Sequence, residues 1–175
     1  VIDASPKLRV VSKMGTGVAE IAVDTATARG VPVTNTRGTN AEAVAQLTVG
    51  LIYAMVRRIP QSDATIRAGG WDKTLYPHAS LGGRTLGLVG YGVIARRVAA
   101  LMRPLGMTFL TYSPRVPDSE IPDWVRRCDL DELVAASDIV SLHNELTPET
   151  RHMFDAARLA RMKPSAYLVN TARGP

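Results

Sequence analysis

LGLVGYGVIARRVAALM, residues 86–102, is the stretch that decides the fold. It begins as a short apolar strand, and from Val93 on its apolar residues recur at helical spacing. Between the two lies Gly90-Tyr91-Gly92-Val93-Ile94-Ala95, a GxGxxA pattern. In such a turn the first glycine permits the bend and the second lets the backbone approach a pyrophosphate, while the small third residue lets the helix pack on the strand. The helix N-terminus then offers free N–H groups to phosphates, so the pattern predicts a dinucleotide site.

The segment MTFLTY, residues 107–112, is expected to be the second strand of the same sheet, and the residue after it selects the cofactor. An acidic residue there binds the adenosine ribose diol of NAD and repels the 2′-phosphate of NADP. This chain has Ser113 instead, with Arg115 two residues later. A hydroxyl and a guanidinium can accept a 2′-phosphate, so we favour NADP slightly over NAD. The alternative is that Arg115 points into solvent and Ser113 tolerates both cofactors.

Helix-length segments separate the strands expected in the second half of the chain. Strands are predicted at 85–90, 107–112, 138–143 and 166–170, and helices at 93–105, 129–137 and 154–162. Asp129 and Asp155 are expected to cap the last two helices. This alternation predicts an α/β fold with a doubly wound parallel sheet of Rossmann type and right-handed crossovers.

The first half is expected to form a second, incomplete α/β domain. We predict strands at 8–12 and 31–36, a helix at 21–30 that ends on Gly30, and one long helix from about 40 to 68. A linker rich in glycine follows at 67–84. We therefore divide the chain into a partial substrate domain, 1–74, and a partial dinucleotide-binding domain, 75–175.

Composition excludes several classes of protein. An apolar content of 46% with 21% charged residues is typical of a globular protein, and no apolar run is long enough to span a membrane. The net charge of +5 comes from scattered arginine pairs and aromatic residues are only 5%, so we expect no nucleic-acid partner. Cys128 is the single cysteine, which fits a reducing cytoplasm. No His/Cys ligand cluster, GxSxG motif or P-loop lysine supports a metal site or a hydrolase.

Six segments together resemble the D-isomer-specific 2-hydroxyacid dehydrogenases: KLRVVSKMGTG, ARGVPVTNTRGTNAEAVAQLTVGLI, RAGGW, LGGRTLGLVGYGVIARRVA, SLHNELTPETRHM and YLVNTARG. The resemblance runs through nearly all of the chain. It implies two α/β domains, a Rossmann domain and a flavodoxin-like substrate domain formed by both chain ends. The chain would then hold part of each domain, as a piece of a longer protein. The helix at about 40–68 would bridge the domains and contribute to a homodimer interface.

The resemblance also implies a role for each matching position. Arg173 matches the catalytic arginine, and Thr48 matches a residue near the nicotinamide. The loop that holds the substrate carboxylate is matched by Met14, Gly15, Thr16 and Gly17. The family's further cofactor contacts match Gly90, Gly92, Val93, Ile94, Ser113, Asn144, Thr171 and Ala172. Arg115 is a candidate cofactor contact because its guanidinium could bind a 2′-phosphate.

The reaction implied is reversible hydride transfer between C4 of a nicotinamide and C2 of a 2-oxo acid. Arg173 would hold the carboxylate and polarise the carbonyl. A histidine paired with a glutamate would move the proton, and in the family both follow the arginine motif. Only Gly174 and Pro175 follow it here, so we expect these residues alone not to complete the reaction. His78, His143 and His152 are expected to be structural or at the surface.

Two departures from the family pattern bear on specificity. Lys13 stands where many members have arginine, which weakens a bidentate grip on a phosphorylated substrate and favours small acids such as glyoxylate or hydroxypyruvate. Glu145 stands where the family usually has proline, and we expect it to turn outward. A non-catalytic dinucleotide sensor or corepressor on the same fold is the alternative function. A methyltransferase would leave NTARG and NAEAVAQ unexplained.

Overall fold

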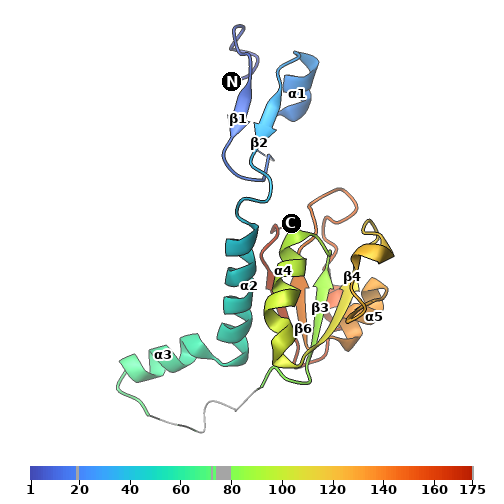
Figure 1. Ribbon diagram of the computed structural model, residues 1–175. Helices are drawn as coiled ribbons and strands as arrows, with labels where there is room; N and C mark the ends of the chain where they lie inside the picture. Colours follow the sequence, from blue (N-terminus) through green and yellow to red (C-terminus); the bar gives the residue numbers. More distant parts are fainter. Residues whose placement is uncertain (19, 72, 74–79, 175) are drawn as a thin grey trace. The chain divides into compact units, whose positions relative to one another are not determined.

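The computed structural model describes residues 1–18, 20–71, 73 and 80–174. The chain divides into two compact units, Val1–Glu42 and Ala43–Pro175. Figure 1 colours the chain from blue at the N-terminus to red at the C-terminus. The domain boundary expected between residues 74 and 75 lies outside the described residues and stays a prediction. His78 also lies outside them.

The first unit is built on a pair of short parallel strands. Strand β1 (Val11–Lys13) pairs with β2 (Val33–Asn35), and helix α1 (Val23–Ala28) lies between them in the chain. Gly30 takes a positive φ of 65° just after α1, which confirms the expected helix end.

The second unit contains a sheet of five parallel strands in the order β5-β4-β3-β6-β7. Their bounds are β3 (Thr85–Val89), β4 (Thr108–Tyr112), β5 (Val125–Arg127), β6 (Ile139–Leu142) and β7 (Tyr167–Asn170). This confirms the doubly wound parallel sheet of Rossmann type. The strand order reverses at β3, which lies between β4 and β6, and ligands of such sheets bind at the carboxyl ends of the strands on either side of the reversal.

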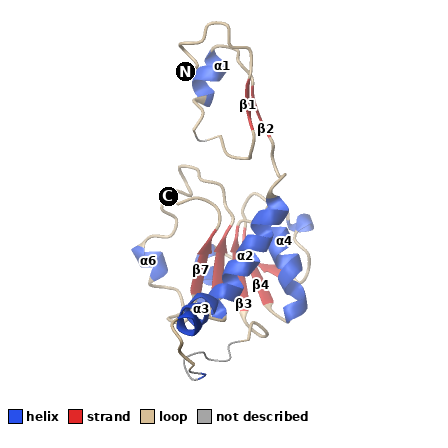
Figure 2. Ribbon diagram, turned by 90° about the vertical axis from the view of Figure 1, so that its left-hand side faces the viewer, coloured by secondary structure: helices blue, strands red, loops and turns tan. Residues whose placement is uncertain are grey.

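Helices cover both faces of this sheet, as Figure 2 shows for α2 and α4 on one side. The helices of the unit are α2 (Ala41–Val56), α3 (Ile59–Arg67), α4 (Val93–Met102), α5 (Leu130–Ala136) and α6 (Ala156–Leu159), with 3-10 turns η2 (Arg103–Leu105) and η3 (Asp118–Glu120). Asp129 and Asp155 cap α5 and α6 as predicted, since their carboxylates accept from the N–H groups of Glu132 and Arg158 at 2.7 and 2.8 Å. Among the described residues, no helix combines the length and the apolar character that a membrane crossing requires.

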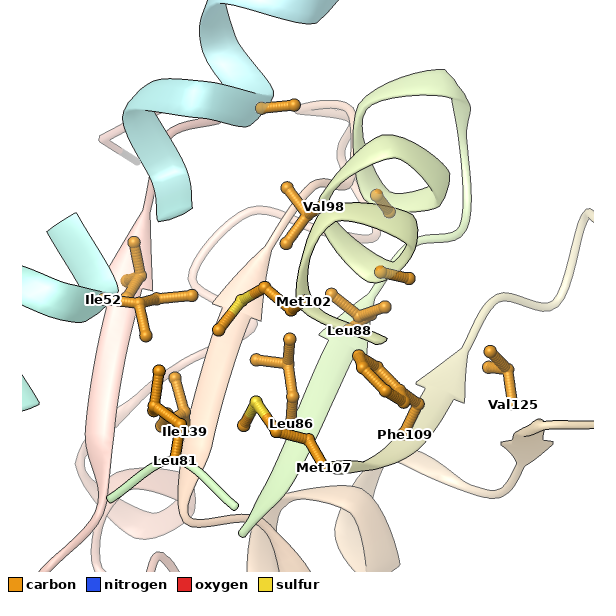
Figure 3. Close-up of a cluster of buried hydrophobic side chains, with 14 of the residues drawn as sticks. Ile52, Leu81, Leu86, Leu88, Val98, Met102, Met107, Phe109, Val125 and Ile139 are labelled. Atoms are coloured by element: carbon orange, nitrogen blue, oxygen red, sulfur yellow. The ribbon is translucent and has the colours of Figure 1, made fainter. Parts of the chain in front are cut away.

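Alternate residues of the strands fill two separate cores. On one face Leu86 and Leu88 of β3 pack with Ile52 of α2 and with Val98 and Met102 of α4 (Figure 3). On the other face Val89 and the neighbouring strands pack against α5 through Leu133 and Val134. This two-sided burial explains why the central strands β3 and β6 are almost wholly apolar in sequence.

The expected single helix over about 40–68 is wrong, because two helices occupy that range. Helix α2 ends at Val56, and Arg58 takes a left-handed φ of 49° before α3 begins at Ile59. Pro60 lies in the first turn of α3. Proline has no N–H to donate and its ring clashes with the preceding turn, so it is tolerated at the start of a helix but not in its interior.

Candidate functional site

The glycine turn follows β3 and touches the loop that follows β6. Gly90 takes a φ of 88°, and its N–H donates to the Tyr112 carbonyl at 2.8 Å. A Cβ at Gly90 would lie 3.0 Å from the Asn144 nitrogen, closer than ordinary contacts allow. Gly90 therefore serves both the turn and the close approach of the chain at Asn144.

Gly92 is the N-cap of α4 and leaves room for a ligand. Its φ is −78°, and a Cβ built on it would meet no atom within 4 Å. No side chain caps α4, so the N–H groups of its first turn remain for an anion. Val93, which begins the helix, is 58% exposed, and Ile94 is partly buried. This arrangement fits a pyrophosphate at the helix N-terminus.

Ser113 supports the glycine turn from the end of β4. The side chain is buried, and its hydroxyl oxygen accepts a hydrogen bond from the Tyr91 N–H at 3.1 Å. One lone pair of that oxygen is thus committed to the protein. Arg115 is exposed, and its Nη1 lies 3.7 Å from Oε2 of Glu145. Sequence reasoning missed this partner, because the two residues come from loops after different strands.

The loop with the predicted catalytic arginine is closed by Asn170 at the end of β7. The Asn170 side chain donates to the Arg173 carbonyl at 2.7 Å and accepts from the Ala172 N–H at 2.9 Å. Arg173 is exposed, and its guanidinium donates to the Ala172 carbonyl at 2.7 Å. A planar, permanently charged group is thus presented at the carboxyl end of the sheet.

Thr48 and Thr171, both predicted to contact the cofactor, touch each other. The Thr48 side chain on α2 is fully buried, and its hydroxyl donates to the Val44 carbonyl at 2.8 Å. Its oxygen lies 3.0 Å from the Thr171 hydroxyl. Because the proton of Thr48 is already given to Val44, Thr171 is the donor of this second bond. The pair joins α2 to the loop that carries Arg173.

A pocket of about 210 Å³ lies where the loops after β6 and β7 meet. Asn144, Ala172 and Arg173 line it, as does Asn170. His152, Met153 and Phe154 also line it, although the sequence predicted no site role for them. The structure therefore brings three of the predicted site residues to one cavity.

His143, at the end of β6, is held inside the unit. Burial lowers the pKa of its imidazole to about 4, and its Nε2 lies 2.9 Å from the Ser141 hydroxyl. A neutral, partly buried imidazole in contact with a serine fits the structural role expected from the sequence.

The predicted substrate loop belongs to the first unit, whereas the other predicted site residues belong to the second. Gly15 has a φ of 117°, and its N–H donates to the Thr36 hydroxyl at 2.8 Å. Met14 is almost wholly exposed. Lys13 pairs with Glu20 at 2.6 Å. Within the part of the chain that the structure describes, no group of three His, Cys, Asp or Glu side chains could hold a metal ion.

Comparison with known proteins places this geometry in one family. The model of the D-isomer specific 2-hydroxyacid dehydrogenase NAD-binding domain matches residues 49–175. The glyoxylate reductase of Thermofilum pendens is 45% identical over 100% of this chain and 53% of its own length, and the hydroxypyruvate reductase of Thermotoga maritima is 38% identical over 99% and 56%. The crystal structure of the NAD-dependent formate dehydrogenase of Staphylococcus aureus in complex with NAD superposes with a TM-score of 0.90 at 30% identity, over 98% of this chain and 52% of that one. The chain spans about half the length of these relatives.

Proposed function

The chain belongs to the D-isomer-specific 2-hydroxyacid dehydrogenase family, and we propose that the full-length protein transfers a hydride between a nicotinamide dinucleotide and a small 2-oxo or 2-hydroxy acid. Relatives named glyoxylate reductase and hydroxypyruvate reductase support the substrate class. The ion pair of Lys13 with Glu20 further disfavours a phosphorylated substrate, because the lysine charge is already compensated.

The observation that carries the proposal is the position of Asn144. This residue abuts Gly90 of the glycine turn and also lines the pocket that contains Arg173. A single residue thus links the predicted pyrophosphate site to the predicted catalytic arginine. Both lie at the carboxyl ends of parallel strands, beside the point where the strand order reverses.

Each group has a defined part in the proposed reaction. The N–H groups at the start of α4 hold the pyrophosphate. The Arg173 guanidinium binds the substrate carboxylate and stabilises the negative charge that develops on the C2 oxygen. A bound nicotinamide supplies or accepts the hydride. We assign the proton transfer to the paired histidine and glutamate that the family resemblance implies, and not to His143, which is partly buried and lies 2.9 Å from the Ser141 hydroxyl.

Replacement of Arg173 tests the proposal. In the full-length protein we expect Arg173→Lys to lower kcat/KM for glyoxylate by about 100-fold or more, because an ammonium cannot bind the carboxylate and carbonyl in one plane. Arg126→Lys is the matched control, since Arg126 is exposed and pairs with Glu132 outside the site. Near-normal turnover of Arg173→Lys would remove this residue from the mechanism.

We also propose that Arg115 lets the protein accept NADPH as well as NADH. Its guanidinium is exposed and lies two residues after Ser113, where no carboxylate stands. Arg115→Ala should weaken NADPH binding and spare NADH, as measured by quenching of protein fluorescence. An equal loss of both affinities would contradict the assignment.

A further inference from the structure

Arg115 is surrounded by acidic groups that the sequence does not place near it. Its guanidinium lies 3.7 Å from the Glu145 carboxylate, with both side chains about two-thirds exposed. Glu149 is also within electrostatic reach. The Thr147 hydroxyl, which donates to Glu149 at 2.7 Å, lowers the pKa of that carboxyl, and Arg115 lowers it further. The single positive charge of Arg115 therefore lies near two negative charges, those of Glu145 and Glu149.

The loop that carries Glu145 is fixed by its own hydrogen bonds. The Thr150 hydroxyl donates to the Glu145 carbonyl at 2.6 Å and accepts from the Thr147 N–H at 2.8 Å. On the other side of Glu145, Asn144 is packed against Gly90. The backbone at Glu145 is therefore held on both sides, which keeps the residue on the loop beside Arg115.

The Arg115–Glu145 pair spans the part of the sheet where an adenosine ribose is read. Arg115 follows β4 and Glu145 follows β6, and these two strands flank β3. In sheets of this type the residue after the second strand contacts the ribose 2′ position. A 2′-phosphate that reached Arg115 would therefore also come within a few ångströms of the Glu145 carboxylate.

We propose that Glu145 is a specificity-determining residue that competes with the 2′-phosphate for Arg115 and so limits the preference for NADP(H). This inference rests on the proposed function, since it concerns the same dinucleotide site. With Glu145 in place, Arg115 is partly neutralised and the protein uses both cofactors. Without it, Glu149 remains near Arg115, and the guanidinium attracts the phosphate more strongly.

The test compares the affinities of NADH and NADPH in the full-length protein and in Glu145→Gln, by isothermal titration at low salt. We expect the substitution to tighten NADPH binding by about fivefold and to leave NADH affinity unchanged. Two unit charges 4 Å apart in water attract each other by about 1 kcal/mol, and this energy corresponds to that factor. The gain should shrink as ionic strength rises. Asp63→Asn is the matched control, because Asp63 forms an exposed ion pair with Arg67 in α3 at 2.8 Å.

A second arm establishes that Glu145 acts through Arg115. In an Arg115→Ala background, Glu145→Gln should no longer tighten NADPH binding by the same factor. An unchanged gain in that background would overturn the proposal, as would an unchanged NADPH affinity in the single variant. A loss of NADH affinity would overturn it too, since Glu145 would then bind the ribose diol itself. Failure of the unaltered protein to bind either nucleotide would instead contradict the proposed function.

Discussion

Burial of His143 makes the stability of the second unit depend on pH. Folding lowers the pKa of this imidazole from 6.5 to about 4. Between pH 4 and 6.5 the imidazole is therefore protonated in the unfolded chain and neutral in the folded one. Stability from this group is complete above pH 6.5 and is lost as pH falls to 4. The loss is on the order of 3 kcal/mol, from 1.36 kcal/mol per pKa unit. Urea unfolding of the protein and of His143→Gln between pH 4 and 7 should show a smaller pH dependence in the variant.

The control for this prediction is His152, which is exposed and has a φ of 55°. His152→Asn should keep the pH profile of the unaltered protein, because asparagine tolerates the left-handed backbone. Parallel profiles for the protein and His143→Gln would show that burial of His143 has no such effect.

Single residues also show how far sequence reasoning reaches at the site. The motif around Gly90 and Gly92 predicted its own local structure, because glycine geometry acts within a few residues. The Ser113 hydroxyl bonds to Tyr91, and Arg115 lies beside Glu145. Neither contact could be predicted from spacing, since each joins loops that only the sheet order brings together.

An added methyl group should have different effects at two glycines of neighbouring elements: a loss of stability at Gly87 and a loss of NADH affinity at Gly92. A Cβ at Gly87 in β3 would lie 2.3 Å from the Ser137 hydroxyl and 2.6 Å from a Leu133 methyl of α5, whereas a Cβ at Gly92 meets open space. We expect Gly87→Ala to destabilise the protein by about 1–3 kcal/mol through overpacking. Gly92→Ala should leave the melting temperature nearly unchanged and weaken NADH binding by about tenfold, because its methyl group enters the pyrophosphate space.

Thermal melts and NADH titrations of both variants check this pair, and each serves as the control of the other. Equal NADH affinity in Gly92→Ala and the unaltered protein would mean that no pyrophosphate approaches this backbone. An unchanged melting temperature in Gly87→Ala would mean that α5 can move away from β3 without cost.

The elements that sequence reasoning found are those with a strong local signal. Four strands of the large sheet carry apolar runs, and α5 and α6 carry aspartate caps. Strand β5 was missed because it has three residues, two of them arginine, and pairs with β4 alone at the edge of the sheet. The break between α2 and α3 was missed because the segments on both sides of it are helical, although Pro60 was a readable signal.

At the scale of the whole molecule, the outer side of α2 supports a homodimer, which we propose from the family resemblance. The side of α2 that faces the sheet buries Ala45, Thr48, Ile52 and Val56. Leu47 and Leu51 of the same helix are 57% and 39% exposed, and α3 adds Ile59 and Ile66, each about half exposed. Several exposed large apolar side chains on adjoining helices are typical of a protein interface.

Leu47→Glu should therefore convert the dimer to a monomer. A charge buried without a partner in an apolar interface costs several kcal/mol, whereas in the monomer this side chain would meet water. Light scattering at micromolar concentration should give half the mass of the unaltered protein. Leu101→Glu on α4 is the matched control, because Leu101 is 44% exposed and we expect the dimer to persist. A dimer that survives Leu47→Glu would place the interface away from α2, and an unaltered protein that is already monomeric would contradict the homodimer itself.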